Sequence, residues 1–319
     1  MQAFHKLDEV AADSRPSVIT IGNFDGLHLA HQAVIARVVE RARTLKVRSL
    51  LVTFDPHPVR ILRPDAAPKL LTPLPEKLNL LQHTGLDAVL VLPFSRDLSM
   101  MPPFQFAEEI IASALHATEV HEGFNFRFGH RAEGDTAHLV EFGRKLGFDV
   151  VVYPPREIRG RVVSSSQVRR LIGSGDMDGA RRLLGRSFAI LSNPAPGRGY
   201  GSRYTVPTVN LGHYGELVPA LGVYVTLLRL GEETFRSVSN IGNRPTFGAD
   251  SFAIESHILD FHPIELTAQT PLELTFLTRL RTEQKFASAE ALRAQIQSDV
   301  ARTRRYFHLL DRFARPGRS

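Results

Sequence analysis

Two histidines three residues apart, His28 and His31, follow an apolar run over 18–21 and two glycines, Gly22 and Gly26. The β-branched run is typical of a buried strand. Apolar residues then recur at helical spacing, at Val34, Ile35, Val38, Val39 and Ala42. The histidines are therefore expected at the entrance of a helix, where backbone N–H groups and the helix dipole suit a polyphosphate. Both imidazoles fall on one face of that first turn and can donate to charged phosphate oxygens. By itself H-x-x-H is short, and it fits a structural or metal-binding pair equally well.

A second group of polar side chains opens another expected helix, at Ser164, Ser165, Ser166 and Arg169. Serines at a helix start ordinarily cap it, and the local sequence favours that interpretation. A capping hydroxyl can also bind a phosphate, and Arg169 follows within one turn.

Aromatic residues and prolines follow two of the expected strands. The first segment is Phe54-Asp55-Pro56-His57-Pro58, and the second, 123–129, contains Phe124, Asn125, Phe126 and Phe128. Because α/β sheets bind ligands beyond the carboxyl ends of their strands, we expect the first segment near His28. Aromatic side chains at such an edge offer a stacking surface for a flat ring. The alternatives are core packing for each aromatic residue and turn formation alone for the prolines.

The elements that must position these residues alternate between strand and helix through the first half of the chain. Strands are expected over 48–54, 87–94, 118–121 and 150–153, and helices within 69–85, 104–115 and 139–146. This alternation predicts an α/β fold with a parallel sheet covered on both faces.

The second half has a different texture. From 188 to about 276, short alternating strands are separated by Pro- and Gly-rich turns, as in a small antiparallel β-barrel. Leu292, Ile296 and Val300 mark one C-terminal amphipathic helix that begins near Ser288. With 319 residues, two domains are expected, 1–186 and 187–319.

Composition narrows the class of protein without deciding its function. The apolar fraction of 43% and the charged fraction of 23% are ordinary for a soluble protein. There is no cysteine, the first fifteen residues are polar, and no apolar run approaches membrane-spanning length, so we expect a cytoplasmic protein with no membrane partner. The net charge of +6 permits nucleic-acid binding, but an enzyme that handles several phosphates would carry it equally. We expect no nucleic-acid partner, and the sequence leaves the oligomeric state open.

The run from Gly22 to Gln32 resembles the G-x-F-D-G-x-H-x-G-H signature of nucleotidylyltransferases, in the form found in prokaryotic FAD synthetases. Ala30 stands where that signature has glycine, and its methyl group would narrow the pocket beside the phosphates. The serine cluster resembles the I-S-S-T-x-I-R element of the same enzymes, with Ser166 in place of threonine.

This resemblance implies a Rossmann-like nucleotidylyltransferase domain and assigns roles to the candidate residues. His28 and His31 would stabilise the α-phosphate of ATP during catalysis. The ATP site would be shaped by Gly22, Asn23, Phe24 and Asp25, with Ser165, Ser166 and Arg169 on the phosphates. The flavin pocket would be lined by Phe54, Pro56, Pro58, Asn125 and Phe128.

The second half resembles riboflavin kinases, whose P-T-A-N, G-V-Y, N-I-G-x-R-P-T and R-x-E-x-K-F motifs match 207–210, 222–224, 240–246 and 281–286. Glu255 falls at the position of the catalytic glutamate of that family. A primary alcohol is a poor nucleophile, so phosphoryl transfer to it benefits from a carboxylate base. Mg²⁺ prefers oxygen ligands, which the Thr208 hydroxyl, the Asn210 carbonyl and ATP can supply. On local grounds alone, Glu255 fits a solvated strand residue and the Thr-Asn pair fits a turn cap.

In order and over nearly the whole chain, these motifs resemble the prokaryotic bifunctional riboflavin kinase/FMN adenylyltransferases. The resemblance implies the substrates riboflavin, FMN and ATP, with Mg²⁺. Ser202, Thr205 and the pair Thr267-Ala268 depart from the kinase pattern. They predict a kinase that works but binds ATP weakly, and they leave open an FAD synthetase with a degenerate kinase domain. A different nucleotidylyltransferase would leave the second half unexplained, and a basic binding module would explain neither phosphate signature.

Overall fold

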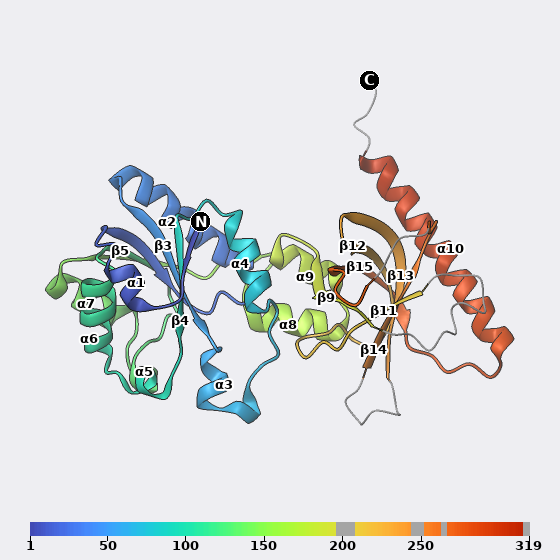
Figure 1. Ribbon diagram of the computed structural model, residues 1–319, viewed down its shortest axis with the longest axis horizontal. Helices are drawn as coiled ribbons and strands as arrows, with labels where there is room; N and C mark the ends of the chain where they lie inside the picture. The colour runs from blue at the N-terminus through green and yellow to red at the C-terminus, as the bar shows by residue number, and fades with distance from the viewer. Residues whose placement is uncertain (196–207, 244–251, 263–266, 315–319) are drawn as a thin grey trace, which may run out of the picture. The chain divides into compact units, whose positions relative to one another are not determined.

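Two separate sheets organise the chain, one parallel and one antiparallel. The computed structural model describes residues 1–195, 208–243, 252–262 and 267–314 (Figure 1). The chain divides into two units, Met1–Ser165 and Ser166–Ser319. The sequence placed the boundary at residue 186, about twenty residues after this division. The two helices between these positions, over 165–184, fall almost entirely in the second unit.

The first unit is built on a six-stranded parallel sheet in the order β1-β4-β3-β2-β5-β6. Its strands are β1 (Gln2–Phe4), β2 (Ser17–Ile21), β3 (Arg48–Asp55), β4 (Ala88–Pro93), β5 (Ala117–Gly123) and β6 (Asp149–Tyr153). Strand order reverses at β2, and the pairing of β2 with β5 ends at Ile19 and Val120. Beyond that pair lies the switch point, where α/β sheets bind their ligands.

Helices cover both faces of this sheet. They are α1 (Leu7–Ala11), α2 (Leu29–Leu45), α3 (Pro58–Leu62), α4 (Leu74–Gln82), α5 (Arg96–Met100), α6 (Pro103–Gln105), the π-helix η2 (Phe106–Ala114), α7 (Thr136–Leu146) and the 3-10 turns η1 (Pro64–Ala66) and η3 (His130–Ala132). A short hairpin follows, β7 (Glu157–Ile158) with β8 (Arg161–Val162).

Alternate residues of β2 enter different cores, as expected for a strand buried on both faces. Val18 packs with Ile35 and Val38 of α2 and Leu81 of α4. Ile19 packs on the opposite face with a cluster that includes α1, η2 and α7, through Val10, Ile110, Ile111, Leu115 and Leu139. The prediction of a parallel sheet covered on both faces is therefore confirmed.

The second unit begins with two helices, α8 (Ser165–Ser174) and α9 (Met177–Leu184). A curled antiparallel sheet follows in the order β10-β11-β14-β13-β12-β15-β9. Its strands are β9 (Phe188–Ser192), β10 (Pro194–Ala195), β11 (Thr208–Leu211), β12 (Gly222–Leu230), β13 (Glu233–Asn243), β14 (Phe252–Ile258) and β15 (Leu272–Thr282). The expected antiparallel barrel is confirmed in this half-barrel form.

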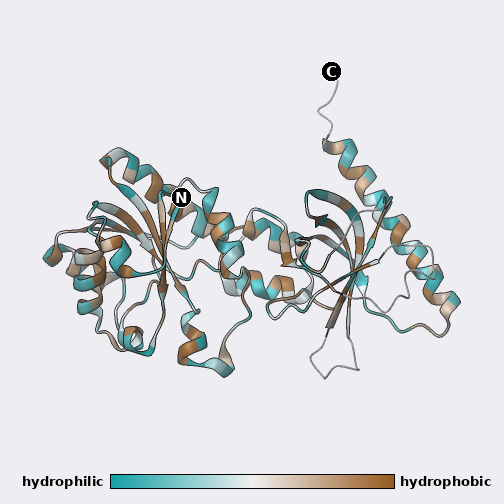
Figure 2. Ribbon diagram, in the orientation of Figure 1, coloured by the Kyte–Doolittle hydropathy of each residue, from teal (hydrophilic) through white to brown (hydrophobic). Residues whose placement is uncertain are grey.

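The predicted C-terminal helix is α10 (Ala289–Ala314), along which hydrophobic and hydrophilic residues alternate (Figure 2). Val300 packs with Phe307 against Val225 of β12, as the helical pattern predicts. Leu292 and Ile296, in the first half of the helix, are 43% and 44% exposed. The stripe that packs on the sheet lies nearer the C-terminal end of the helix.

Local sequence missed two features of the first unit. The polar N-terminus forms β1 and α1, because Phe4 and Val10 are buried although their neighbours are exposed. The helix expected within 69–85 is α4 alone, since Pro73 is its N-cap and the preceding residues form a loop. That loop and α4 bear directly on the site.

Candidate active sites

The turn between β2 and α2 has a backbone that few sequences could adopt. Phe24, Gly26 and Leu27 all have positive φ, at 46°, 81° and 40°. A Cβ on Gly26 would lie 2.6 Å from Leu71 Cδ1, so a side chain there would clash as well as be strained. The predicted glycine turn is therefore present, and at Gly26 it packs tightly against the segment that precedes α4.

His28 and His31 lie at the N-terminus of α2, as predicted. His28 is the N-cap residue, and its Nδ1 accepts a hydrogen bond of 3.4 Å from the His31 backbone N–H. The two rings stack with centroids 3.6 Å apart and planes 18° apart. The Phe24 ring meets His31 edge-on at 5.0 Å. When His28 is neutral, its proton is therefore on Nε2.

Burial and nearby charges favour the neutral form of His31. Burial, followed by the charges of His28 and Lys77, holds the pKa of His31 well below its ordinary value. The buried His31 Nδ1 and the buried Asn23 Oδ1 have no hydrogen-bond partner in the part of the chain that the structure describes. Buried polar atoms without partners are costly, and at a helix N-terminus they indicate a place for a polar ligand.

Asn23 and Asp25 connect the turn to the segment 71–77 by hydrogen bonds. The Asp25 carboxylate accepts hydrogen bonds from the backbone N–H groups of Leu71 and Thr72, at 3.0 and 2.9 Å. The Gly26 N–H donates to the Thr72 hydroxyl at 2.9 Å, and the Asn23 carbonyl accepts from Lys77 Nζ at 2.7 Å. The segment 71–77 therefore holds the turn at three successive places. Sequence reasoning missed this segment.

The serine element returns to the same turn. The Ser165 hydroxyl donates to the Asp25 carbonyl oxygen at 2.9 Å, so this predicted phosphate-binding residue lies beside the histidine turn. Ser166 is exposed and Arg169 is half-buried, both on α8. They belong to the second unit, and their roles on the phosphates remain predictions.

The five expected flavin residues lie on two loops. Phe54 is the penultimate residue of β3, and Pro56 and Pro58 come after the strand, with Pro58 as the first residue of α3. Asn125 is exposed after β5. Phe128 is only 7% exposed and packs in the core with Phe106, Phe126 and Phe142, as the core-packing alternative holds. The neighbouring Phe124, which was not assigned to the pocket, is 51% exposed.

In the second unit, strand pairing brings together residues far apart in the sequence. Asn210 of β11 is the register partner of Glu255 of β14, and Glu255 is in turn opposite Asn240 of β13. Thr208 lies two residues before Asn210 and thus on the same face. Glu255 and Thr208 are exposed. The expected kinase residues Ser202 and Thr205, and the motif residues Pro207, Arg244, Pro245 and Thr246, lie outside the described residues.

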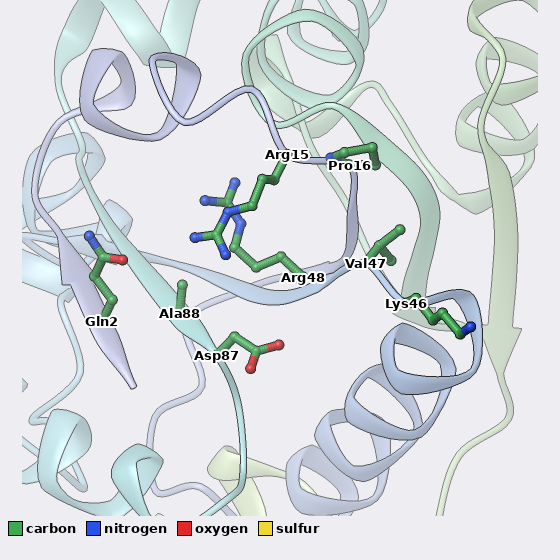
Figure 3. A pocket seen from close by; sticks show the side chains of 8 residues that line it. All are labelled: Gln2, Arg15, Pro16, Lys46, Val47, Arg48, Asp87 and Ala88. Carbon is green, nitrogen blue, oxygen red and sulfur yellow. The ribbon is translucent and has the colours of Figure 1, made fainter.

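A cavity of about 470 Å³ lies at the amino-terminal ends of the strands of the parallel sheet, opposite the end that carries the histidines (Figure 3). Its walls include Gln2, Arg48 and Ala88, which begin β1, β3 and β4. The guanidinium groups of Arg15 and Arg48 lie next to each other in this cavity, and both donate to Asp13 (Figure 3). Since it opens at the amino ends of the strands, it is separate from the histidine site.

Comparisons with known proteins found matches to both halves of the chain. A FAD synthetase family model matches residues 10–167, and a riboflavin kinase family model matches residues 184–307. A bifunctional riboflavin kinase/FMN adenylyltransferase from Pseudomonas fluorescens is 37% identical over 95% of this chain and 97% of its own length. The protein of the same description from Escherichia coli strain K12 is 33% identical over 97% of this chain and 98% of its own. The chain belongs to the bifunctional riboflavin kinase/FMN adenylyltransferase family.

A solved structure whose title names another kind of protein has a similar fold. The crystal structure of a macrolide-efflux protein from Streptococcus pneumoniae is similar with a TM-score of 0.85, over 95% of this chain and 98% of that chain. The two sequences are 24% identical, so this likeness shows a shared fold and nothing of function. Within the described ranges, no helix is both long enough and apolar enough to cross a membrane.

Proposed function

We propose that this member of the family makes FAD from riboflavin in two steps, with ATP as co-substrate in each. Residues 187–319 phosphorylate riboflavin to FMN, and residues 1–186 transfer AMP from a second ATP to FMN. The two family models, over 10–167 and 184–307, support this division. The observation that carries the proposal is the pair of separate sites, one with stacked histidines at a helix N-terminus and one with Glu255 opposite Asn210. We place the enzyme in the cytoplasm, which suits its lack of cysteine.

Adenylyl transfer needs no base on this enzyme. The phosphate of FMN is already largely ionised near neutral pH, so its oxygen attacks the α-phosphorus of ATP directly. One P–O bond forms as the bond to the bridging oxygen breaks, and pyrophosphate leaves. His28 and His31 donate N–H groups to the α-phosphate, where charge develops in the transition state. The Ser165 hydroxyl, which lies beside the turn, holds the remaining phosphates.

Flavin binding in this half falls to the two loops that follow β3 and β5. Phe54, Pro56 and Pro58 supply one wall, and Asn125 a polar contact. Phe128 supports that wall from the core instead of stacking on the ring. Phe124, exposed after β5, offers the free aromatic face.

Phosphorylation in the other half does need a base. The Glu255 carboxylate accepts the proton of the riboflavin 5′-hydroxyl as its oxygen attacks the γ-phosphorus, and ADP leaves. The Thr208 hydroxyl and the Asn210 amide oxygen lie on the same strand face, and both are the oxygen donors that Mg²⁺ prefers. They are the residues that would hold Mg²⁺, which would neutralise phosphate charge when bound.

One pair of variants tests both assignments, each serving as the control for the other. His28→Ala with His31→Ala should abolish FAD formation from FMN and leave FMN formation from riboflavin intact. Glu255→Gln should lower FMN formation by about 100-fold or more and spare FAD formation from supplied FMN. Chromatography of the flavins after incubation with ATP and magnesium reads both. FAD formation at the wild-type rate in the histidine double variant would refute that assignment.

The same assay addresses the degenerate-kinase alternative. A wild-type enzyme that converts FMN to FAD but never riboflavin to FMN, even at saturating ATP, would support that alternative. A wild-type enzyme that makes neither product would refute the proposed function as a whole.

A further inference from the structure

A lysine is buried behind the histidine turn. Lys77, in the first turn of α4, is 6% exposed, and its ammonium donates to the Asn23 carbonyl at 2.7 Å and the Thr53 hydroxyl at 3.1 Å. Burying an ammonium group is expensive unless partners compensate it. Both of these partners are neutral oxygens. Burial lowers the pKa of the Lys77 ammonium, and the nearby charges of Asp25 and Asp55 oppose that shift.

The Asn23 carbonyl is held by two donors at once. Besides Lys77, the Thr53 hydroxyl of β3 donates to it at 3.2 Å. A peptide group is planar and trans, so a carbonyl that points toward Lys77 directs the next N–H, that of Phe24, to the opposite side. The lysine thereby sets the orientation of a backbone N–H in the phosphate-binding turn. The buried Asn23 Oδ1, without a partner among the described residues, belongs to the same fixed residue.

We propose that Lys77 is a positioning residue for adenylyl transfer, which fixes the Asn23 peptide from inside the protein and places a positive charge beside the histidine pair. The inference rests on the proposed function, because it assigns Lys77 to the reaction of that site. Lys77 does not touch the substrate in this assignment. It acts through Asn23 and through the histidines.

The charge of Lys77 has a second effect, on His31. Together with burial and His28, it lowers the pKa of His31, and Asp25 and Asp55 face Lys77 itself. Two imidazolium rings stacked at 3.6 Å would repel each other, so neutrality preserves the pair before ATP binds. The charge of Lys77 therefore adds to the effect of burial, which is the main reason that His31 stays a neutral donor.

The experiment compares Lys77→Met, which removes the charge at similar length, with Lys145→Met, which removes an exposed lysine of α7. FAD formation from supplied FMN and FMN formation from riboflavin are measured on the same samples. Lys77→Met should lower kcat for FAD formation by at least about 10-fold, because small displacements of positioned groups cost up to about 100-fold. FMN formation should stay at the wild-type rate, and Lys145→Met should leave both activities unchanged.

A titration separates this role from a purely structural one. The His31 Cε1–H resonance is followed against pH in ¹³C-histidine-labelled enzyme and assigned by its loss in His31→Gln. Its midpoint should move to higher pH in Lys77→Met, because a repelling cation is gone. It should stay at the wild-type position in Lys77→Arg, which keeps the charge.

Three results decide the matter. A wild-type kcat for FAD formation in Lys77→Met, or an unmoved His31 midpoint, overturns the inference. If Lys77→Met does not fold, Lys77→Gln keeps a donor without the charge, and an unmoved His31 midpoint in that variant overturns the inference. A wild-type enzyme that makes no FAD from FMN would instead refute the proposed function on which the inference rests.

Discussion

Asp25 is expected to act mainly as a stabilising residue of the phosphate turn. Its carboxylate is buried and accepts the backbone N–H groups of Leu71 and Thr72 together with the Thr72 hydroxyl, at 3.0, 2.9 and 3.3 Å. Asp25→Ala would leave these donors buried without their acceptor. Each such donor costs at least about 1 kcal/mol, and removing one partner of a buried charged interaction typically costs about 3–5 kcal/mol, so the variant should lose roughly 3–5 kcal/mol of unfolding free energy. That is a large part of the stability of a typical domain, about 5–15 kcal/mol.

Asp25→Asn is the matched variant, since its one oxygen can still accept from both backbone groups. It should lose only about 1–2 kcal/mol, because a neutral acceptor replaces a charged one. Urea unfolding is followed by far-UV circular dichroism, which suits a chain without tryptophan. Hydrogen exchange at residues 69–77 should report the loss locally.

The opposite pattern would refute this reasoning. If Asp25→Ala is as stable as the wild type while the KM for ATP in FAD formation rises steeply, Asp25 contacts ATP and does not fasten the turn. FMN formation, measured on the same samples, is the control for general misfolding.

Three further predictions concern pH, backbone and the kinase loop. Glu122, buried and bonded to the Ile21 N–H, has a pKa raised well above its ordinary value, chiefly by burial. The contribution of Glu122 to the free energy of unfolding should therefore be fully present below about pH 4.5 and be lost as pH rises through its raised pKa, so Glu122→Gln should show a smaller fall than the wild type between unfolding measurements at pH 5 and 8. Gly26→Ala should destabilise by about 1–3 kcal/mol more than Gly160→Ala, since both have positive φ but only the former would overlap a buried leucine; equal losses in urea unfolding would contradict this. Ser202→Arg with Thr205→Gly should lower the apparent KM for ATP in FMN formation, and an unchanged KM would make those departures neutral.

The sequence predicted the strand, turn and helix around His28 because their signals are local. Apolar periodicity, two glycines and a short motif all fall within one stretch, and the structure and the family comparison confirm the fold that they indicated. Lys77 shows the limit of such reasoning. In the sequence it is an ordinary lysine in a helical stretch, and only the packing of α4 against β3 and the turn makes it buried. Phe128 is the converse case, because an aromatic residue expected beside the flavin lies in the core.

The kinase site depends on register, which local sequence does not specify. In a strand the side chains alternate, so a slip of one residue would turn Glu255 inward and bring its buried neighbour Ser256 to the surface. On the buried face of the sheet, a row of hydrogen-bonded hydroxyls opposes such a slip. The Ser256 hydroxyl lies 2.7 Å from that of Ser239, which in turn lies 2.7 Å from that of Thr226. A one-residue slip would carry the Ser256 hydroxyl to the surface and leave the buried Ser239 hydroxyl without that partner, at a cost of about 1–3 kcal/mol. The buried hydroxyls therefore help to fix the strand register that places Glu255 opposite Asn210 on the exposed face of the sheet.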